Sequence, residues 1–428
     1  MIITKRLKGK AIEAWLGPAG DRARRALEQV RERVGKSGKK LAIYLDIAEP
    51  WSYLLAQATQ RLIEHYPVEL EVHVVTPPAS DVDPFPLLRS KHAVRDAQQL
   101  VEYWDVEFPG KKEADPGAIR DASTVLVRER PARDQLRAFL ELAESVWTND
   151  KKTLAKLLGS WGHEAHGSVP PILNESYSRL RKAGHYMAGM ASYGGEWYWG
   201  IDRLPYLEEV LAKDFNVDLA HVVSPRADRA KLPLENAKSC EVWYSFRSPY
   251  SYIALEQIEA VLAPYNIPLE LRAVFPMVQR GVQLPNEKRM YVVRDAKREA
   301  DRLRVPFGNI CDPIGPGVDH CIALAYWQRA NQLPLVKSIM RGIWSEARDM
   351  AEYVDLKYVV ERAGLDWNEA KAQLANPEAA KWANTNATDL AVYGLWGVPS
   401  IRLGDFVAWG QDRLPLLADR LRRNALPE

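Results

Sequence analysis

The order of apolar and polar residues along the chain predicts an α/β protein in which one short unit occurs twice. In residues 242–246 alternate side chains fall on one face of an extended chain, and their aromatic and β-branched character favours a strand. After Arg247 the spacing changes to that of a helix. Residues 41–45, followed by a helical pattern over residues 51–66, predict a second strand, turn and helix.

A constant displacement relates these two units. The residues Pro50, Ser52, Tyr53, Tyr66, Leu70 and Glu71 recur 199 positions later as Pro249, Ser251, Tyr252, Tyr265, Leu269 and Glu270. The same displacement carries residues 94–97 onto 293–296. Near the end of each half the motif W-G-x-D-R-L-P occurs at 199–205 and again at 409–415, now displaced by 210. A displacement without gaps indicates an internal duplication, and the difference of 11 residues predicts insertions between the two matches.

Each half is expected to follow one plan. A strand, a helix and a second strand (residues 68–75 or 269–275) precede a long helical stretch, and short strands and a helix close the half. In the second half helices are expected over residues 287–304, 319–330, 335–347, 353–362 and 368–390, which predicts an inserted helical subdomain. Residues 397–406 then predict a strand, a Gly-Asp turn and a strand.

The connecting stretches divide the chain into four parts. Residues 1–40 are expected to form a helical extension, in which residues 21–34 mix Arg and Glu at helical spacings. The two domains are expected over residues 41–222 and 239–428, with a polar linker at 223–238 that shows no apolar period.

Composition narrows the classes of function. A chain of 428 residues is too long for a single core, which agrees with two domains. Lys plus Arg total 58 against 56 for Asp plus Glu, so the net charge of +2 gives no broad electrostatic case for nucleic acid. Three cysteines, without C-x-x-C or metal-ligand spacing, indicate neither a disulfide framework nor a metal site. With no secretory signal and no apolar run of membrane length, a cytoplasmic protein without a membrane partner is expected.

Ser248 stands where the second of these helices begins, with Pro249 at the first helical position. A helix N-terminus gathers unpaired N–H groups and the positive end of the helix dipole, so this turn suits an anion such as a thiolate. The alternative is that the hydroxyl only caps the helix. The residues of the turn alone leave both interpretations open.

Three motifs in the second half resemble a known family. S-P-Y-S at 248–251, G-V-P-S at 397–400 and G-Q-D-R at 410–413 are similar to those of 2-hydroxychromene-2-carboxylate isomerases and kappa-class glutathione transferases. The resemblance implies two tandem thioredoxin-like domains, each with a DsbA-type helical insertion. Ser248 and Ser251 stand at the places of the redox C-x-x-C pair, which excludes dithiol exchange at this site. The resemblance implies that glutathione supplies the thiol and that Ser248 donates a hydrogen bond to its sulfur.

The other site residues are also implied by the resemblance. Val398 and Pro399 match a cis-proline segment whose backbone pairs with the cysteinyl part of glutathione, and Gln411 and Asp412 match the residues that hold its γ-glutamyl end. Lys288 and Tyr291 match a helix that borders the acceptor-substrate pocket; as an alternative they are a solvated lysine and a packed tyrosine. Residues 275–281 do not match the family's asparagine-containing loop, so the acceptor substrate is not specified.

The first half differs from the second at the positions that match Ser248, Pro399 and Gln411. Glu49 matches Ser248, and a carboxylate there is expected to cap the helix well and to repel a thiolate. Gly189 aligns with Pro399 and Ile201 replaces Gln411, whereas Asp202 is kept. The first half is therefore expected to be a non-catalytic copy that takes the place of a second subunit, making a pseudo-dimer within one chain.

Two functions follow from these expectations. One is a glutathione-dependent isomerase or transferase, in which Ser248 stabilises the thiolate for addition to an unsaturated, including an aromatic-derived, small organic substrate. The other is a scaffold that binds glutathione or another ligand without turnover. Capture on immobilised glutathione followed by a turnover assay separates them.

Overall fold

The structure, a computed structural model, describes residues 2–17, 19–20, 22–23, 26, 40–226, 230–235, 237–282 and 285–425. The chain divides into two compact units. The N-terminal unit comprises residues 24–229 and 285–288, and the C-terminal unit comprises residues 1–23, 230–284 and 289–428. In the expected extension, α1 (Ile2–Leu16) groups with the C-terminal unit, and most of the helix expected over 21–34 lies outside the described residues.

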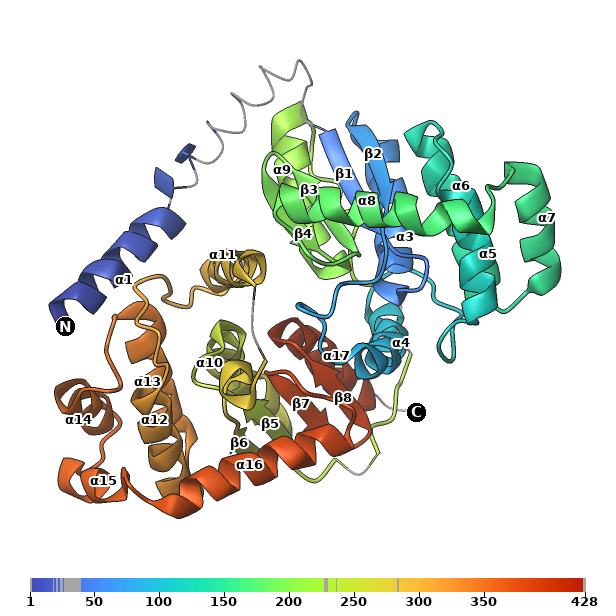
Figure 1. The fold of residues 1–428 in the computed structure, drawn as a ribbon. Helices are drawn as coiled ribbons and strands as arrows, with labels where there is room; N and C mark the ends of the chain where they lie inside the picture. Colours follow the sequence, from blue (N-terminus) through green and yellow to red (C-terminus); the bar gives the residue numbers. More distant parts are fainter. Residues whose placement is uncertain are drawn as a thin grey trace. The chain divides into compact units, whose positions relative to one another are not determined.

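The N-terminal unit has a four-stranded mixed sheet in the order β2-β1-β3-β4 (Figure 1). β1 (Lys40–Leu45) leads through a turn into α3 (Pro50–His65) and then into β2 (Glu69–Val74), which pairs with β1 in parallel. β3 (Met190–Tyr193) lies antiparallel to β1 on its other side, and β4 (Glu196–Trp199) pairs antiparallel with β3. A 3-10 turn, η2 (Ile201–Arg203), then leads into α9 (Leu204–Phe215).

The C-terminal unit repeats this sheet in the order β6-β5-β7-β8. Its strands and flanking helices are β5 (Cys240–Tyr244), α10 (Pro249–Leu262), β6 (Leu269–Ala273), β7 (Ser400–Leu403), β8 (Phe406–Trp409), η5 (Gln411–Arg413) and α17 (Leu414–Asn424). The registers also agree: Leu41 pairs with Leu70 as Cys240 pairs with Leu269, and Met190 pairs with Trp199 as Ser400 pairs with Trp409. The duplication predicted from the sequence is thus confirmed at the level of strand pairing.

Helices fill the stretch between the second and third strand of each sheet. In the N-terminal unit they are α4 (Pro86–Tyr103), α5 (Pro116–Leu126), α6 (Ala132–Trp147), α7 (Lys151–Trp161), the 3-10 turn η1 (His166–Ser168) and α8 (Val169–Ala183). In the C-terminal unit they are α11 (Asn286–Arg302), α12 (Pro316–Trp327), α13 (Leu333–Ser345), α14 (Tyr353–Arg362), α15 (Trp367–Gln373) and α16 (Pro377–Val392). Both units therefore carry a helical insertion at the same place in the order of strands.

The single helix expected over residues 368–390 is wrong. The segment breaks into α15 and α16, because Pro377 has no N–H to continue a helix and Asn376 caps the new one by accepting from the Glu378 N–H at 3.0 Å. The starts of α7 and α14 are displaced by 202 residues, and those of α8 and α16 by 208. Most of the extra length of the second half therefore lies at α15, where the first half has only η1.

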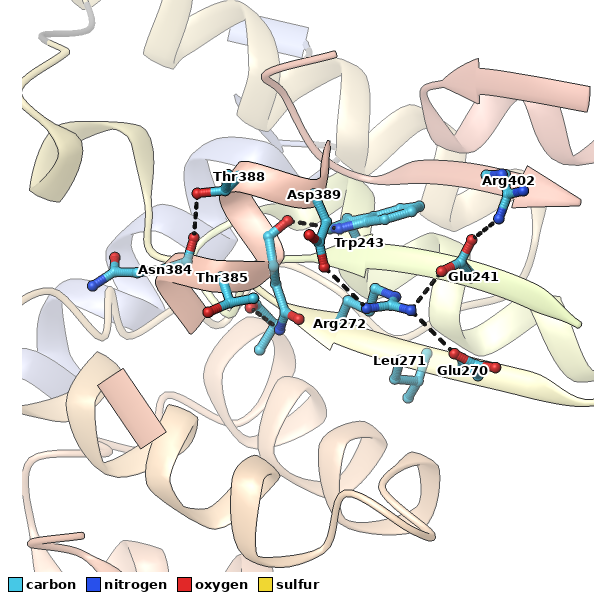
Figure 2. A network of polar contacts seen from close by, with 12 residues as sticks. Glu241, Trp243, Glu270, Leu271, Arg272, Asn384, Thr385, Thr388, Asp389 and Arg402 are labelled. Carbon is cyan, nitrogen blue, oxygen red and sulfur yellow. Dashed lines mark hydrogen bonds and ion pairs between the residues drawn. The ribbon is translucent and has the colours of Figure 1, made fainter. Parts of the chain in front are cut away.

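A buried polar network holds α16 against one face of the C-terminal sheet (Figure 2). The Glu241 carboxylate pairs with Arg272 at 2.5 Å and also with Arg402, and the Arg272 guanidinium lies 5.5 Å from the centre of the Trp243 ring. The Trp243 indole N–H donates to the Asn386 carbonyl of α16 at 2.8 Å. Because each charge in this network has an opposite partner, the buried Glu241 is compensated on two sides.

Among the described residues no helix is both long enough and apolar enough to cross a lipid bilayer. The same part of the chain contains no group of three or more His, Cys, Asp and Glu side chains arranged to hold a metal ion.

Candidate functional site

The turn between β5 and α10 presents the Ser248 hydroxyl at the start of the helix. Ser248 has the extended backbone of an N-cap residue, with φ −108° and ψ 114°, and its Oγ accepts from the Ser251 N–H at 3.1 Å. The same hydroxyl donates to the Val398 carbonyl oxygen at 3.3 Å. Ser248 is therefore a helix cap, and its one proton is directed at the backbone of the segment before β7.

That segment contains the Val398–Pro399 bond, which is cis as the sequence predicted. The Pro399 carbonyl accepts from the Gly410 N–H at 2.9 Å, which ties the segment to the end of β8. The Val398 side chain packs against a buried cluster that includes Trp243 and Leu390. Val398 thus presents a backbone carbonyl toward the N-terminus of α10 from a firmly packed position.

Gln411 and Asp412 lie in η5, directly after Gly410 and before α17. The Gln411 side chain is buried, and its Nε2 donates to Glu299 Oε2 on α11 at 2.7 Å. The Asp412 side chain is 24% exposed, and its Oδ1 lies 3.4 Å from an Arg413 guanidinium nitrogen. A buried amide and a more accessible carboxylate are therefore carried by consecutive residues just before the last helix.

The side chains of Lys288 and Tyr291 differ in exposure, since Lys288 is half-buried and Tyr291 is buried. Tyr291 is packed in the interior at 6% exposure. Lys288 belongs to the short segment 285–288 that groups with the N-terminal unit, where its Nζ donates to the Val82 carbonyl at 3.0 Å. Burial lowers the pKa of Lys288. The structure thus agrees with the packed tyrosine of the alternative, whereas Lys288 is half-buried with its ammonium group bonded to a backbone carbonyl.

Two features of the C-terminal unit were not found from the sequence. Arg247, the residue before Ser248, forms a two-pronged ion pair with Asp312 at 2.7 and 2.8 Å. Gln411 has a buried partner in Glu299. Each pair joins residues 65 or 112 positions apart, so no local pattern reveals it. For Glu299 a signal did exist, because the matching residue of the first half is the apolar Leu100.

The corresponding turn of the N-terminal unit is occupied by charged side chains. The Glu49 carboxylate is 1% exposed and pairs with Arg89 at 2.7 Å, and Arg89 also pairs with Asp83 at 2.6 Å. Burial, only partly opposed by the Arg89 charge, raises the pKa of Glu49 to about 7. Glu49 makes no side-chain capping bond, so the expectation that it caps α3 well is wrong. The carboxylate turns to Arg89 because a full ion pair compensates its burial better than one neutral N–H donor.

Gly189 takes the position of Pro399 in the N-terminal unit, as the alignment of the W-G-x-D-R motifs predicted. The Gly189 carbonyl accepts from the Gly200 N–H at 2.8 Å, matching the bond between Pro399 and Gly410. The Gly189 N–H donates to the Tyr44 carbonyl at 2.9 Å, which a proline has no hydrogen to do. This segment is therefore paired differently from its counterpart.

Neither the turn before α3 nor the turn before α10 contains a cysteine. Cys240, Cys311 and Cys321 are all buried and unbridged. Burial raises the pKa of Cys240 to about 12 and that of Cys321 well above its usual value, so neither thiol ionises near neutral pH.

Part of the chain is similar to known proteins. Residues 240–422 match the family model of the DSBA-like thioredoxin domain. A solved 2-hydroxychromene-2-carboxylate isomerase is 21% identical, covering 43% of this chain and 94% of its own, with a TM-score of 0.38. The cytosolic disulfide reductase DsbM from Pseudomonas aeruginosa is 17% identical, covering 44% and 95%, with a TM-score of 0.34. A structure of DsbM with GSH is 15% identical, covering 44% and 96%, with a TM-score of 0.32.

No curated protein matches the chain. The family match covers the strands, the helical insertion and the closing helix of the C-terminal unit, and the strand order and register of the N-terminal unit repeat that arrangement. Residues 240–422 are therefore a DSBA-like thioredoxin domain, in which serines stand at the two positions of the redox pair.

Proposed function

We propose that the C-terminal unit is a glutathione-dependent isomerase or transferase for unsaturated small organic substrates, with Ser248 stabilising the thiolate. The observation that carries the proposal is the contact of 3.3 Å between Ser248 Oγ, at the N-terminus of α10, and the carbonyl of Val398 in a cis Val-Pro segment. Disulfide exchange is not supported, because Ser248 and Ser251 supply no thiol and the three cysteines are buried elsewhere.

The groups present fit a thiol-containing peptide. The Val398 carbonyl is an acceptor suited to the amide N–H of a cysteinyl residue, as in the addition of a strand. When a ligand N–H takes this acceptor, the Ser248 hydroxyl is released from Val398 and turns its proton toward the ligand sulfur. The Ser251 N–H bond to Ser248 Oγ remains, so the hydroxyl oxygen stays in place while its proton changes partner.

The turn lowers the pKa of a bound thiol by two effects. The Ser248 O–H donates to the charged form, and the N-terminal N–H groups of α10 place the positive end of the helix dipole beside it. When bound, glutathione supplies a thiolate whose reversible addition to a conjugated double bond permits isomerisation, and whose lasting addition gives a conjugate. The two activities therefore require the same residues of this chain.

The rest of the peptide has complementary groups in the same unit. Asp412 offers a partly exposed carboxylate for the ammonium group of a γ-glutamyl residue, beside the Gln411 amide. Of the two residues expected at the acceptor substrate, Tyr291 belongs to this unit and is proposed to lie behind the acceptor site. The N-terminal unit, which has Glu49 and Gly189 at the decisive positions, is proposed to bind no glutathione and to stand in for a second subunit, so that the chain is monomeric.

A scaffold that binds glutathione without turnover is the second candidate. It is favoured by one observation, since the Ser248 hydroxyl already has a capping role that requires no catalysis. Calorimetry with glutathione and a turnover assay on a panel of conjugated carbonyl compounds separate the two functions. Binding at one site per chain with turnover supports the enzyme, binding without turnover supports the scaffold, and absence of binding contradicts both.

A further inference from the structure

Glu299 and Gln411 form a buried polar pair beside the proposed γ-glutamyl site. Gln411 is 4% exposed and Glu299 is 5% exposed, and their side chains meet at 2.7 Å. Gln411 opens η5 next to Asp412, while Glu299 projects from the C-terminal half of α11. The pair therefore joins the start of the last helix to the helical insertion within the same unit.

The fold itself does not require this polar pair. At the matching positions of the N-terminal unit stand Leu100 and Ile201, which are 1% and 2% exposed. The two sheets have the same order and register, so an apolar pair serves an equivalent architecture. Replacing buried polar pairs by apolar residues of similar size is often neutral or stabilising. The presence of Glu299 and Gln411 in one unit only points to a role beyond packing.

The hydrogen bond determines which way the Gln411 amide faces. Gln411 Nε2 donates to Glu299 Oε2, so it is the NH₂ group of Gln411 that faces Glu299. The amide oxygen, Oε1, is then directed away from Glu299 as an acceptor. An amide oxygen and the carboxylate of the following residue are both acceptors of the kind that suits an ammonium group.

We propose that Glu299 is a positioning residue that orients Gln411, so that Gln411 Oε1 and the Asp412 carboxylate together receive the α-ammonium group of a γ-glutamyl thiol. The inference rests on the proposed function, and it adds a rule of ligand selection. A γ-glutamyl thiol with its ammonium group is preferred to the same peptide without that group. Glu299 touches neither the thiol nor the substrate, so its effect falls on affinity and not on the thiol pKa.

The first half of the chain supplies the test variant. In the full-length protein, Glu299→Leu combined with Gln411→Ile installs the pair already found at Leu100 and Ile201, and the variant is expected to fold. Calorimetry with glutathione is expected to show a Kd raised about 10- to 100-fold, as for loss of a charge-assisted hydrogen bond. The preference for glutathione over deaminated glutathione is expected to fall several-fold from roughly 10-fold, with the remainder due to Asp412, which the variant keeps. The thiolate pKa of bound ligand is expected to stay unchanged.

Two single variants serve as matched controls. Glu299→Gln keeps an oxygen that accepts from Gln411 Nε2, so it is expected to retain most of the affinity and the ligand preference. Asp301→Asn removes an exposed carboxylate from the same helix, one that pairs only with Lys297 among the described residues, and is expected to leave both unchanged. Together they separate the orientation of Gln411 from the general charge of α11.

The outcomes distinguish this inference from the function on which it rests. Wild-type protein that does not bind glutathione contradicts the proposed function and, with it, the inference. Wild-type binding that the double variant reproduces, with the same preference for the ammonium group, overturns the role of Glu299 alone. A double variant that fails to fold while Glu299→Gln folds and binds normally also overturns it, because the pair is then a requirement of the fold.

Discussion

In the N-terminal unit the residue before α3 is Glu49, and in the C-terminal unit the residue before α10 is Ser248. Their backbones are nearly the same, with φ −113° and ψ 117° for Glu49 and φ −108° and ψ 114° for Ser248. Each N–H donates at 3.0 Å to the carbonyl of the residue three positions before it. One turn geometry thus holds an internally paired carboxyl side chain in one unit and a hydroxyl in the other.

Contacts that both units share are those the fold needs. The Trp51 indole donates to Asp96 at 2.8 Å, and at the matching positions the Tyr250 hydroxyl donates to Asp295 at 2.8 Å. The donor differs between the two units, but in each unit it bonds to a buried aspartate at the matching position. Asp295 lies on α11, the helix that carries Tyr291. Because the matching contact occurs in both units, Asp295 serves to attach α11 to α10. Differences between the units are therefore a better guide to function than similarities.

The differences between the two units include three residues of the proposed glutathione site. Ser248, Pro399 and Gln411 are replaced by Glu49, Gly189 and Ile201. In the N-terminal unit the carboxylate of Glu49 lies where a thiolate is proposed to bind in the other unit, and Arg89 supplies its counter-charge.

The largest effect is expected from removing that counter-charge. Arg89→Met leaves Glu49 and Asp83 buried without their cation, and breaking a buried pair typically costs about 3 to 5 kcal/mol. We expect denaturant unfolding of the N-terminal unit to shift to much lower concentration. The triple variant Arg89→Met, Glu49→Gln, Asp83→Asn removes the orphaned charges and is expected to recover most of the loss. Equal stability of Arg89→Met and wild type contradicts the internal ion-pair interpretation.

Ser248→Ala tests the role of the hydroxyl at the matching turn of the C-terminal unit. If the hydroxyl steadies the thiolate, its loss removes a charge-assisted bond worth roughly 1.5 to 3 kcal/mol, so the pKa of bound glutathione rises by about one to two units. Turnover near neutral pH falls by a similar factor and recovers as pH rises, because the thiol ionises again in base. The measurements are ultraviolet titration of the thiolate and the pH-rate profile.

A cap elsewhere in the same unit provides the control. Asp366 caps α15 by accepting from the Glu369 N–H at 2.9 Å, and Asp366→Ala is expected to cost about 1 kcal/mol of stability without changing the thiolate titration. Identical titration curves for wild type and Ser248→Ala would reduce Ser248 to a helix cap of the same kind.

The repeat predicted much of the fold because backbone pairing follows residue spacing. A displacement of 199 fixes the register of the two parallel strand pairs, and the matched W-G-x-D-R motifs identified Gly189 as the counterpart of Pro399. The direction of the Glu49 carboxylate was not predictable in this way. It depends on Arg89, 40 positions away, and on the free energy of burial, which sequence spacing does not report. The break at Pro377 was readable, since Asn-Pro is a common helix start.

The titration of Glu49 is expected to change the free energy of unfolding by about 3 kcal/mol. Its pKa is raised from 4.5 to about 7 in the folded protein, so the protonated form favours folding. This stabilising contribution is complete below about pH 4.5 and is lost as pH rises through about 7. The free energy of unfolding of the N-terminal unit should therefore decline between pH 5 and pH 8. Glu49→Gln should flatten that decline, and an unchanged slope would show that Arg89 keeps Glu49 ionised throughout.

The smallest effect is expected from Glu49→Ser, which restores the serine but not the site. Gly189 still donates its N–H to Tyr44, Leu100 and Ile201 still offer no polar group, and Arg89 remains beside the turn. Calorimetry is therefore expected to give one glutathione per chain for both wild type and Glu49→Ser. The combination Glu49→Ser with Ser248→Ala identifies the remaining site, because its affinity should match that of Ser248→Ala alone. Two equivalent sites in Glu49→Ser would show that the hydroxyl at the helix N-terminus is sufficient, and that the cis-proline segment and the Glu299–Gln411 pair are not what distinguishes the two units.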